Sequence, residues 1–315
     1  MLVSSLIFII SLVVLLVSAR FLTKAAERLG LYFGMSSFVI GVFIVGIGTS
    51  LPELVAGVLA GLAGNSEIVS GNVLGANISN IFLILGLIAV LSRKGIEMGG
   101  GYIMVDLNFL IGSSLLLGLI MMDGEIAFSE GLFLLATYAI YSHFLLRSGQ
   151  QPLVKTNGPN SPIKTSFPFK ALLILLASGV GIYVGADHTV DSIIAIAQHL
   201  VVPPSLISLT VLSLGTTLPE LAVSVTAIRQ RKPAIAVGNI LGSCVFNALV
   251  IPGAVSGFGT IQVPEYLIGF SLPVFVVASV LFYLLTQDKK ISSSEGMLFL
   301  IFYAFFISKV VASFI

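Results

Sequence analysis

Long apolar runs separated by short polar stretches make up most of the chain. The runs hold about 20 residues each, the length that a helix needs to cross the hydrocarbon core of a bilayer. The pattern therefore predicts ten membrane-spanning helices. Their ranges are 3–27, 36–62, 69–92, 102–122, 127–147, 168–195, 204–228, 234–256, 265–286 and 294–314.

Composition strengthens this interpretation. Hydrophobic residues make up 57% of the 315 residues and charged residues only 9%, whereas a soluble domain carries about a quarter charged residues. The predicted fold class is an all-α polytopic membrane protein. A net charge of +1 suggests no nucleic-acid partner, and a single cysteine, Cys244, excludes an internal disulfide and a multi-cysteine metal site. No nucleotide-binding loop or cofactor motif occurs, so we expect neither an enzyme nor a bound cofactor.

The basic residues predict the orientation. When the connections are numbered alternately, all but one of the 15 lysines and arginines fall on one side of the membrane. The exception is Lys309, near the end of the last span. Because basic residues stay on the cytoplasmic side, both termini are expected to be extracellular. The expected location is the plasma membrane.

Two motifs occur twice at one fixed offset. A shift of 167 residues aligns "GTSLPEL" (48–54) with "GTTLPEL" (215–221), and "GNVLGANISN" (71–80) with "GNILGSCVFN" (238–247). One offset across two motifs indicates duplication. Each half then has five spans, and an odd number inserts the second half with opposite polarity, as in many transporters. We expect a first inverted repeat over 1–147, a cytoplasmic linker over 148–167 and a second repeat over 168–315.

The first motif carries a carboxylate in the middle of an apolar run, Glu53 in one half and Glu220 in the other. A charge at the bilayer centre costs at least about 2.5–3.5 kcal/mol. No lysine or arginine lies near either glutamate within its span, so a transported cation is the expected counter-charge. Pro52 and Pro219 remove backbone donors, which frees carbonyls around residues 46–49 and 213–216.

Other oxygen donors accompany the two glutamates. Hydroxyls come from Thr49, Ser50, Thr216 and Thr217, and amide oxygens from Asn80 and Asn247. Hard cations such as Ca²⁺ and Na⁺ prefer oxygen ligands. Two carboxylates balance one Ca²⁺ or two Na⁺, which is a physical basis for exchanging one ion for the other.

Three further sets of residues receive structural interpretations. Gly71 and Gly75, like Gly238 and Gly242, are spaced so that spans 3 and 8 can press against spans 2 and 7. Asp106 is expected at the membrane interface. A cluster of Asp187, His188 and Asp191 is interpreted as a helix end near the headgroups, since its counterparts at the same offset are Arg20, Phe21 and Lys24.

Together, the paired "GTSLPE" and "GTTLPE" motifs, each followed by "GN(V/I)LG" and an asparagine, resemble the alpha repeats of the Na⁺/Ca²⁺ exchanger family. This family lies within the cation/Ca²⁺ antiporter superfamily, and the resemblance covers essentially the whole chain. It implies that Glu53 and Glu220 hold Ca²⁺ with the carbonyls of Thr49 and Thr216. It also implies that Na⁺ uses the same carboxylates, the carbonyls of Gly46 and Ser213, and the hydroxyls of Ser50, Thr217 and Ser243. Access would alternate as spans 1 and 6 slide over the core.

Two positions depart from the archaeal-type members that the chain resembles. Ala76 stands where they have a serine, so one Na⁺ ligand is absent, and Asn247 stands where they have an aspartate. The "GNxxE" signature of the H⁺/Ca²⁺ branch is absent, which favours Na⁺. The function expected is Ca²⁺/Na⁺ antiport by a monomer in a lipid bilayer. The alternatives are H⁺/Ca²⁺ (or other divalent cation) exchange through the same glutamates, a cation channel, and a membrane scaffold without transport.

Overall fold

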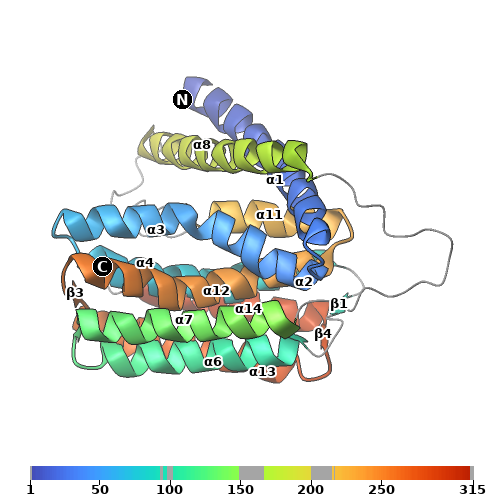
Figure 1. The fold of residues 1–315 in the computed structure, drawn as a ribbon. Helices are drawn as coiled ribbons and strands as arrows, with labels where there is room; N and C mark the ends of the chain where they lie inside the picture. Colours follow the sequence, from blue (N-terminus) through green and yellow to red (C-terminus); the bar gives the residue numbers. More distant parts are fainter. Residues whose placement is uncertain are drawn as a thin grey trace.

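The structure, a computed structural model, describes residues 2–92, 95–97, 102–148, 167–199, 215 and 217–312. It is almost entirely helical (Figure 1). The first part of the chain forms α1 (Leu2–Tyr32), α2 (Ser37–Val39), η1 (Ile40–Gly46), α3 (Ile47–Leu62), α4 (Glu67–Ile78), η2 (Ser79–Leu85), α5 (Gly86–Leu91), α6 (Tyr102–Met121) and α7 (Phe128–Ser148). The second part forms α8 (Phe169–His199), α11 (Leu218–Arg229), α12 (Pro233–Val255), η4 (Ser256–Phe258), η5 (Leu267–Ser271), α13 (Leu272–Leu285) and α14 (Ser293–Ala312).

Seven helices in the described part of the chain are long and apolar enough to cross a membrane. They are Val3–Tyr32, Ser37–Leu62, Glu67–Leu91, Phe169–Thr189, Pro233–Phe258, Leu267–Leu285 and Ser293–Ala312. The prediction of a helical protein with several membrane spans is confirmed. The helices α6 and α7 coincide with two further predicted spans, and α11 covers the end of the span predicted over 204–228. Residues 204–214 and 216 of that span lie outside the described residues, so the count of ten stays a prediction.

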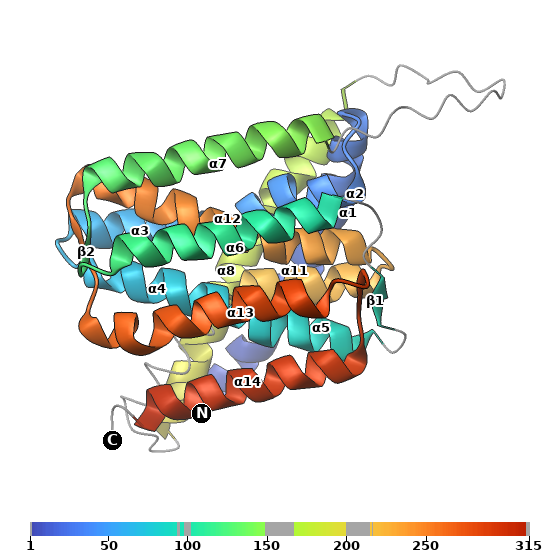
Figure 2. The ribbon, with the colours of Figure 1, turned by 90° about the horizontal axis from the view of Figure 1, so that it is seen from below.

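The helices pack in layers around α12. This helix contacts η1, α3, α4, α6, α7 and α11, and every side chain from Ile235 to Leu249 is buried. The long helices α1 and α8 lie side by side and cross over α3 and α11 on one face of the bundle (Figure 1). On the opposite face, α6, α7, α13 and α14 form the outer layer (Figure 2). The two long helices are therefore the layer with the least attachment to α12.

Two short antiparallel ribbons join the two parts of the chain at opposite ends of the bundle. Strand β1 (Ile96–Glu97) pairs with β4 (Lys290–Ile291), and β2 (Glu125–Ile126) pairs with β3 (Ile261–Gln262). Each ribbon joins two connections that the alternating count assigns to the same side of the membrane. The helix α1 begins, and α14 ends, toward the end that carries β2 and β3 (Figure 1).

A buried polar pair joins α6 to α7. The Tyr141 hydroxyl donates a hydrogen bond of 2.7 Å to Asp106 Oδ1, and both side chains are 1% exposed. Asp106 is therefore enclosed by protein, and the expectation that it lies at the depth of the membrane interface stays a prediction.

Tyr141→Phe should destabilise the protein by about 1–3 kcal/mol, because it leaves a buried acceptor without its donor. Thermal unfolding in detergent measures the effect. Tyr266→Phe is the matched control, since this tyrosine is 64% exposed and should tolerate the change. Equal unfolding midpoints for the two variants would contradict the assigned role of the pair.

Candidate ion-binding site

The two motif glutamates lie in the interior, on helices from the two halves of the chain. Glu53 is on α3 and Glu220 is in the first turn of α11, and each is 1% exposed. They are close enough for their charges to repel one another. The Ser50 hydroxyl donates a hydrogen bond of 3.1 Å to Glu220 Oε1, which links the first motif directly to the second.

The backbone around the two prolines differs between the halves. Pro52 lies inside α3, which continues through it, so the missing N–H leaves the Gly48 carbonyl without its usual helical donor. The π-helical segment η1 precedes this helix directly, and such segments are frequent at functional sites. By contrast, Pro219 occupies the first turn of α11, a position where a proline is tolerated. The negative charge of Glu220 also suits the positive end of this helix.

Hydroxyl and amide groups from both halves surround Gly46. The Thr49 hydroxyl donates to Asn239 Oδ1 at 3.1 Å and lies 3.4 Å from Ser243 Oγ. The Ser243 hydroxyl in turn donates to the Gly46 carbonyl at 3.3 Å. Asn239 donates to Ser224 Oγ at 2.9 Å and to the Glu220 carbonyl at 3.3 Å. These contacts tie η1 and α3 to α11 and α12 at the level of the glutamates.

Several buried polar atoms on α3, α4, η2, α11 and α12 make no hydrogen bond within the described part of the chain. They are both carboxylate oxygens of Glu53, Oε2 of Glu220, and both amide atoms of Asn77, Asn80 and Asn247. Cys244 lies beside both Asn80 and Glu220. Because buried polar groups in folded proteins almost always have partners, such a set is typical of a site that binds something else. The free oxygens are the ligand type that Ca²⁺ and Na⁺ prefer.

Close contact between backbones holds the halves together here. A Cβ added to Gly242 would lie 2.5 Å from the Val42 carbonyl, and one added to Gly238 would meet the Phe38 carbonyl. Among the described residues, these glycines therefore bring α12 closest to α2 and η1, both in span 2, and not to span 7 as predicted. Gly71 and Gly75 make no such close approach to any described residue. The spacing of the glycines shows that another helix can approach closely, but it does not show which helix this is.

Comparison with known proteins identifies the family. The family model described as sodium/calcium exchanger protein matches residues 3–147 and 170–311. The chain belongs to the sodium/calcium exchanger family. It is a membrane transporter and not an enzyme, in agreement with the expectation from the sequence.

Relatives cover nearly the whole chain. The protein is 31% identical over 350 residues to the sodium/calcium exchanger MaX1 of Methanosarcina acetivorans, with 97% of each chain covered. It is 32% identical over 300 residues to an uncharacterized membrane protein of Methanocaldococcus jannaschii, with 94% of each covered. Among solved structures, it is similar to the sodium-calcium exchanger NCX_Mj soaked with zero Na⁺ and Ca²⁺. That match has a TM-score of 0.83 and 28% identity, and covers 98% of this chain and 99% of the other.

The remaining predicted site residues of this family member are placed as follows. Thr217 is the N-cap residue of α11 and is 2% exposed. Thr216 and Ser213 lie outside the described residues. Ala76, the counterpart of Ser243 at the 167-residue offset, is buried at 3% exposure, so the two halves offer different ligands at this position.

From the sequence alone, Asn77 is not recognised as a candidate site residue, and the role of Asn239 stays open. Asn77 is fully buried with no partner for its amide in the described part of the chain, although its "NIS" context suggests only a chance glycosylation motif. Its position one turn before Asn80 is the signal that the sequence offers. Asn239 can be interpreted from the sequence as a tie between helices, and its contacts with Thr49 and Ser224 establish that role.

Proposed function

We propose that the protein is a secondary-active antiporter that exchanges Ca²⁺ for Na⁺ across the plasma membrane. Glu53 and Glu220 hold the ions midway through the bilayer. The observation that carries the proposal is the pair of buried carboxylates from the two motifs, which lie close enough to repel and have three of four oxygens unpaired among the described residues. Membership of the sodium/calcium exchanger family supports Na⁺ and Ca²⁺ as the transported ions.

The charge of the site explains the coupling. Two buried carboxylates without a counter-ion are costly in a low-dielectric interior, and repulsion between them adds to this cost. One Ca²⁺ or two Na⁺ neutralise them. A loaded site can therefore change its exposure from one side of the membrane to the other, whereas an empty site resists it.

The ligand roles proposed are those that the resemblance to the exchanger family implies. Ca²⁺ is held by both glutamates with the carbonyls of Thr49 and Thr216. Na⁺ uses the same carboxylates, the carbonyls of Gly46 and Ser213, and the hydroxyls of Ser50, Thr217 and Ser243. Asn80 and Asn247 supply further amide oxygens. The unpaired state of both amides among the described residues supports this last role.

The proposed architecture is ten spans in two inverted repeats, residues 1–147 and 168–315, joined by a cytoplasmic linker. The repeated motifs support it, and so do the two ribbons, since each joins connections assigned to the same side. The family model also leaves residues 148–169 unmatched. Both termini are extracellular in this arrangement, and one chain holds both halves of the site, so the monomer suffices.

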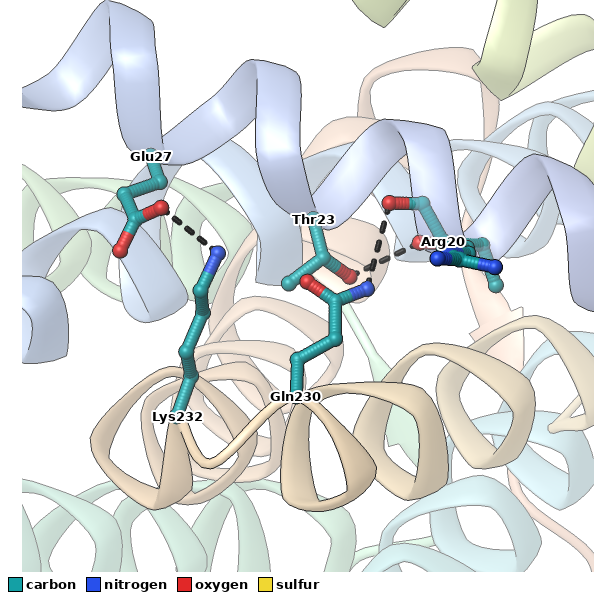
Figure 3. A network of polar contacts seen from close by, with 6 residues as sticks. Arg20, Thr23, Glu27, Gln230 and Lys232 are labelled. Atoms are coloured by element: carbon teal, nitrogen blue, oxygen red, sulfur yellow. Dashed lines mark hydrogen bonds and ion pairs between the residues drawn. The ribbon is translucent and has the colours of Figure 1, made fainter.

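Alternating access would move α1 and α8 over the core. At the proposed cytoplasmic end, Lys232 Nζ forms an ion pair of 2.6 Å with Glu27 Oε2, and Gln230 donates to the Arg20 carbonyl (Figure 3). Glu27 and Arg20 lie on α1, whereas Gln230 and Lys232 lie in the turn between α11 and α12. These contacts hold the cytoplasmic part of α1 against the core in this conformation.

Glu27→Gln should shift the protein toward states in which α1 has moved. An ion pair that is partly exposed is worth up to about 1 kcal/mol, or roughly a fivefold change in population. The measurement is the apparent Ca²⁺ affinity at each face, in vesicles of one known orientation, and the two affinities should move in opposite directions. Glu97→Gln is the control, because its pairing with Lys290 joins β1 to β4 and does not involve α1. If the two variants behave alike, the ion pair does not restrain α1.

Transport into vesicles made with the purified protein tests the proposed function. An outward Na⁺ gradient should drive Ca²⁺ uptake, and a proton gradient alone should not. Uptake driven by protons and indifferent to Na⁺ would instead identify H⁺/Ca²⁺ exchange through the same glutamates. Flux at channel rates without a counter-ion would reject a carrier.

A further inference from the structure

Asn77, on α4, is a buried asparagine to which none of the ligand roles above applies. Its side chain is 0% exposed, and neither its amide oxygen nor its amide nitrogen has a hydrogen-bond partner in the described part of the chain. Asn80 follows three residues later, so both amides lie on one side of this span. Because a buried amide without partners costs free energy, Asn77 is a candidate to bind something other than protein.

Contacts between the two halves of the chain are reciprocal. Gly86 and Gly253 are equivalent at the 167-residue offset. A Cβ added to Gly86 would lie 3.0 Å from the Gly296 carbonyl oxygen, and one added to Gly253 would lie 3.0 Å from the Gly131 carbonyl oxygen. These two partners are themselves equivalent to within one helical turn. The ribbons repeat the pattern, because exchanging the halves turns the pair β1–β4 into β3–β2. A pseudo-two-fold relation therefore describes these contacts.

The same relation gives Asn77 its neighbours, because its equivalent at the offset is Cys244. Cys244 is fully buried, lies beside Asn80, and is close enough to the glutamate of its own half to interact with that charge. Exchange of the halves therefore places Asn77 beside Asn247 and near Glu53. Both amide atoms of Asn247 and both oxygens of Glu53 are also unpaired among the described residues, as expected for groups that share a ligand.

The two halves differ in ligand chemistry at two adjacent positions. The first half has Ala76 and Asn77, whereas the second has Ser243 and Cys244. Each half therefore has one oxygen donor over these two positions, a hydroxyl in one and an amide in the other. The second half adds a sulfur, which is a soft ligand, whereas Ca²⁺ and Na⁺ are hard cations that prefer oxygen.

We infer that Asn77 supplies its amide oxygen to the transported cation beside Glu53, and that this oxygen directs a hard cation such as Ca²⁺ to that side of the site. The inference rests on the proposed function, in which the two motif glutamates hold the ion. The position of Asn77 makes up for the hydroxyl that Ala76 lacks. Asn77 is then a specificity-determining residue, and its equivalent Cys244 makes the other side of the site softer.

The first test is Ca²⁺ binding to the purified protein, measured by isothermal titration calorimetry. Even an outer-shell partner of a metal site is worth about 10–100-fold in affinity, so Asn77→Ala should raise the Kd for Ca²⁺ at least about 10-fold. Asn77→Asp keeps a ligand oxygen but loses the amide donor, and should bind Ca²⁺ at least as tightly as the unaltered protein. Asn108→Ala, at an exposed position on α6, is the control and should bind normally.

The aspartate variant separates a ligand from a structural tie between helices. If Asn77 acted only by donating a hydrogen bond, aspartate would fail as alanine does. An unchanged Kd in Asn77→Ala, or equal losses in the alanine and aspartate variants, would overturn the inference.

The second test does not depend on the alanine variant. Cys244 is the only cysteine, so Asn77→Cys in a Cys244→Ala background carries one thiol. Cd²⁺ is a soft cation that binds thiolate, with release of the thiol proton. Binding should produce ultraviolet sulfur-to-cadmium charge-transfer absorption that Ca²⁺ removes by competition. Asn108→Cys in the same background is the control, and any absorption that it gives should be insensitive to Ca²⁺. Absent or Ca²⁺-insensitive absorption in the Asn77→Cys variant would reject Asn77 as a ligand.

Failure of this inference can be told apart from failure of the proposed function. Normal Na⁺-driven Ca²⁺ exchange together with an unchanged Kd in Asn77→Ala would reject the ligand role and leave the proposed function intact. Ca²⁺-sensitive Cd²⁺ absorption in the Asn77→Cys variant, without any Na⁺-driven exchange in the unaltered protein, would reject the proposed function and retain Asn77 as a metal ligand.

Discussion

Glu53→Gln and Glu220→Gln should each abolish Ca²⁺ exchange. Glutamine keeps the shape of the side chain but removes one of the two charges that balance Ca²⁺. Removing one partner of a buried charge interaction costs about 3–5 kcal/mol, so transport should fall at least about 100-fold. The substitution removes the proposed ligand and should leave the fold intact. A neutral side chain is less costly to bury in this interior than a carboxylate.

Ca²⁺ uptake into vesicles and thermal unfolding of the same preparations provide the two measurements. Uptake should be lost while the unfolding midpoint stays the same or rises. Glu67→Gln, in the exposed first turn of α4, is the control and should transport normally. Near-normal exchange by either glutamine variant would remove that residue from the site.

Gly242→Ala should have the second largest effect. The new Cβ would lie 2.5 Å from the Val42 carbonyl oxygen and 2.7 Å from Val42 Cα, both of them backbone atoms of η1. Backbone atoms cannot rotate away, so η1 and α12 must separate. Overpacking of this kind costs about 1–3 kcal/mol or more. Separation would also move the adjacent Ser243 away from the Gly46 carbonyl, so Na⁺-dependent exchange should weaken together with stability.

The matched control is Gly112→Ala on α6, where an added Cβ meets no described atom within 4 Å. Alanine is favoured over glycine in a helix by about 1 kcal/mol, so this variant should be as stable as the unaltered protein or more so. Thermal unfolding and Na⁺-driven uptake compare the two. If Gly242→Ala matched Gly112→Ala in both, the close contact between η1 and α12 would not be required.

Much of the fold is predictable because the bilayer sets a length for each helix. Apolar runs identify the long helices, and the 167-residue offset relates Glu53 to Glu220 from the amino-acid sequence alone. The apolar runs do not show which helices pack against one another. The spacing of Gly242 predicts a contact with span 7, whereas the residue faces η1. The position of Asp106 in the sequence does not predict the hydrogen bond that its side chain accepts from Tyr141.

The candidate ion-binding site is likewise only partly predictable from the sequence. Oxygen-bearing side chains beside a buried glutamate can be identified from residue type and spacing alone. The link from Ser50 to Glu220 cannot, because it depends on how α3 and α11 approach each other. Nor can the continuation of α3 through Pro52, since a proline in a membrane helix can break it or be accommodated by neighbours. Asn77 escapes sequence reasoning because its context matches an unrelated surface motif.

The most direct test of the central claim is a crystal structure of the protein with bound Ca²⁺, with the ion located by its anomalous scattering. We predict one strong peak in the interior, with oxygens of both Glu53 and Glu220 within about 2.3–2.6 Å of it. A map in which the two carboxylates bind no common ion, or in which Ca²⁺ occupies other interior residues, would contradict the account.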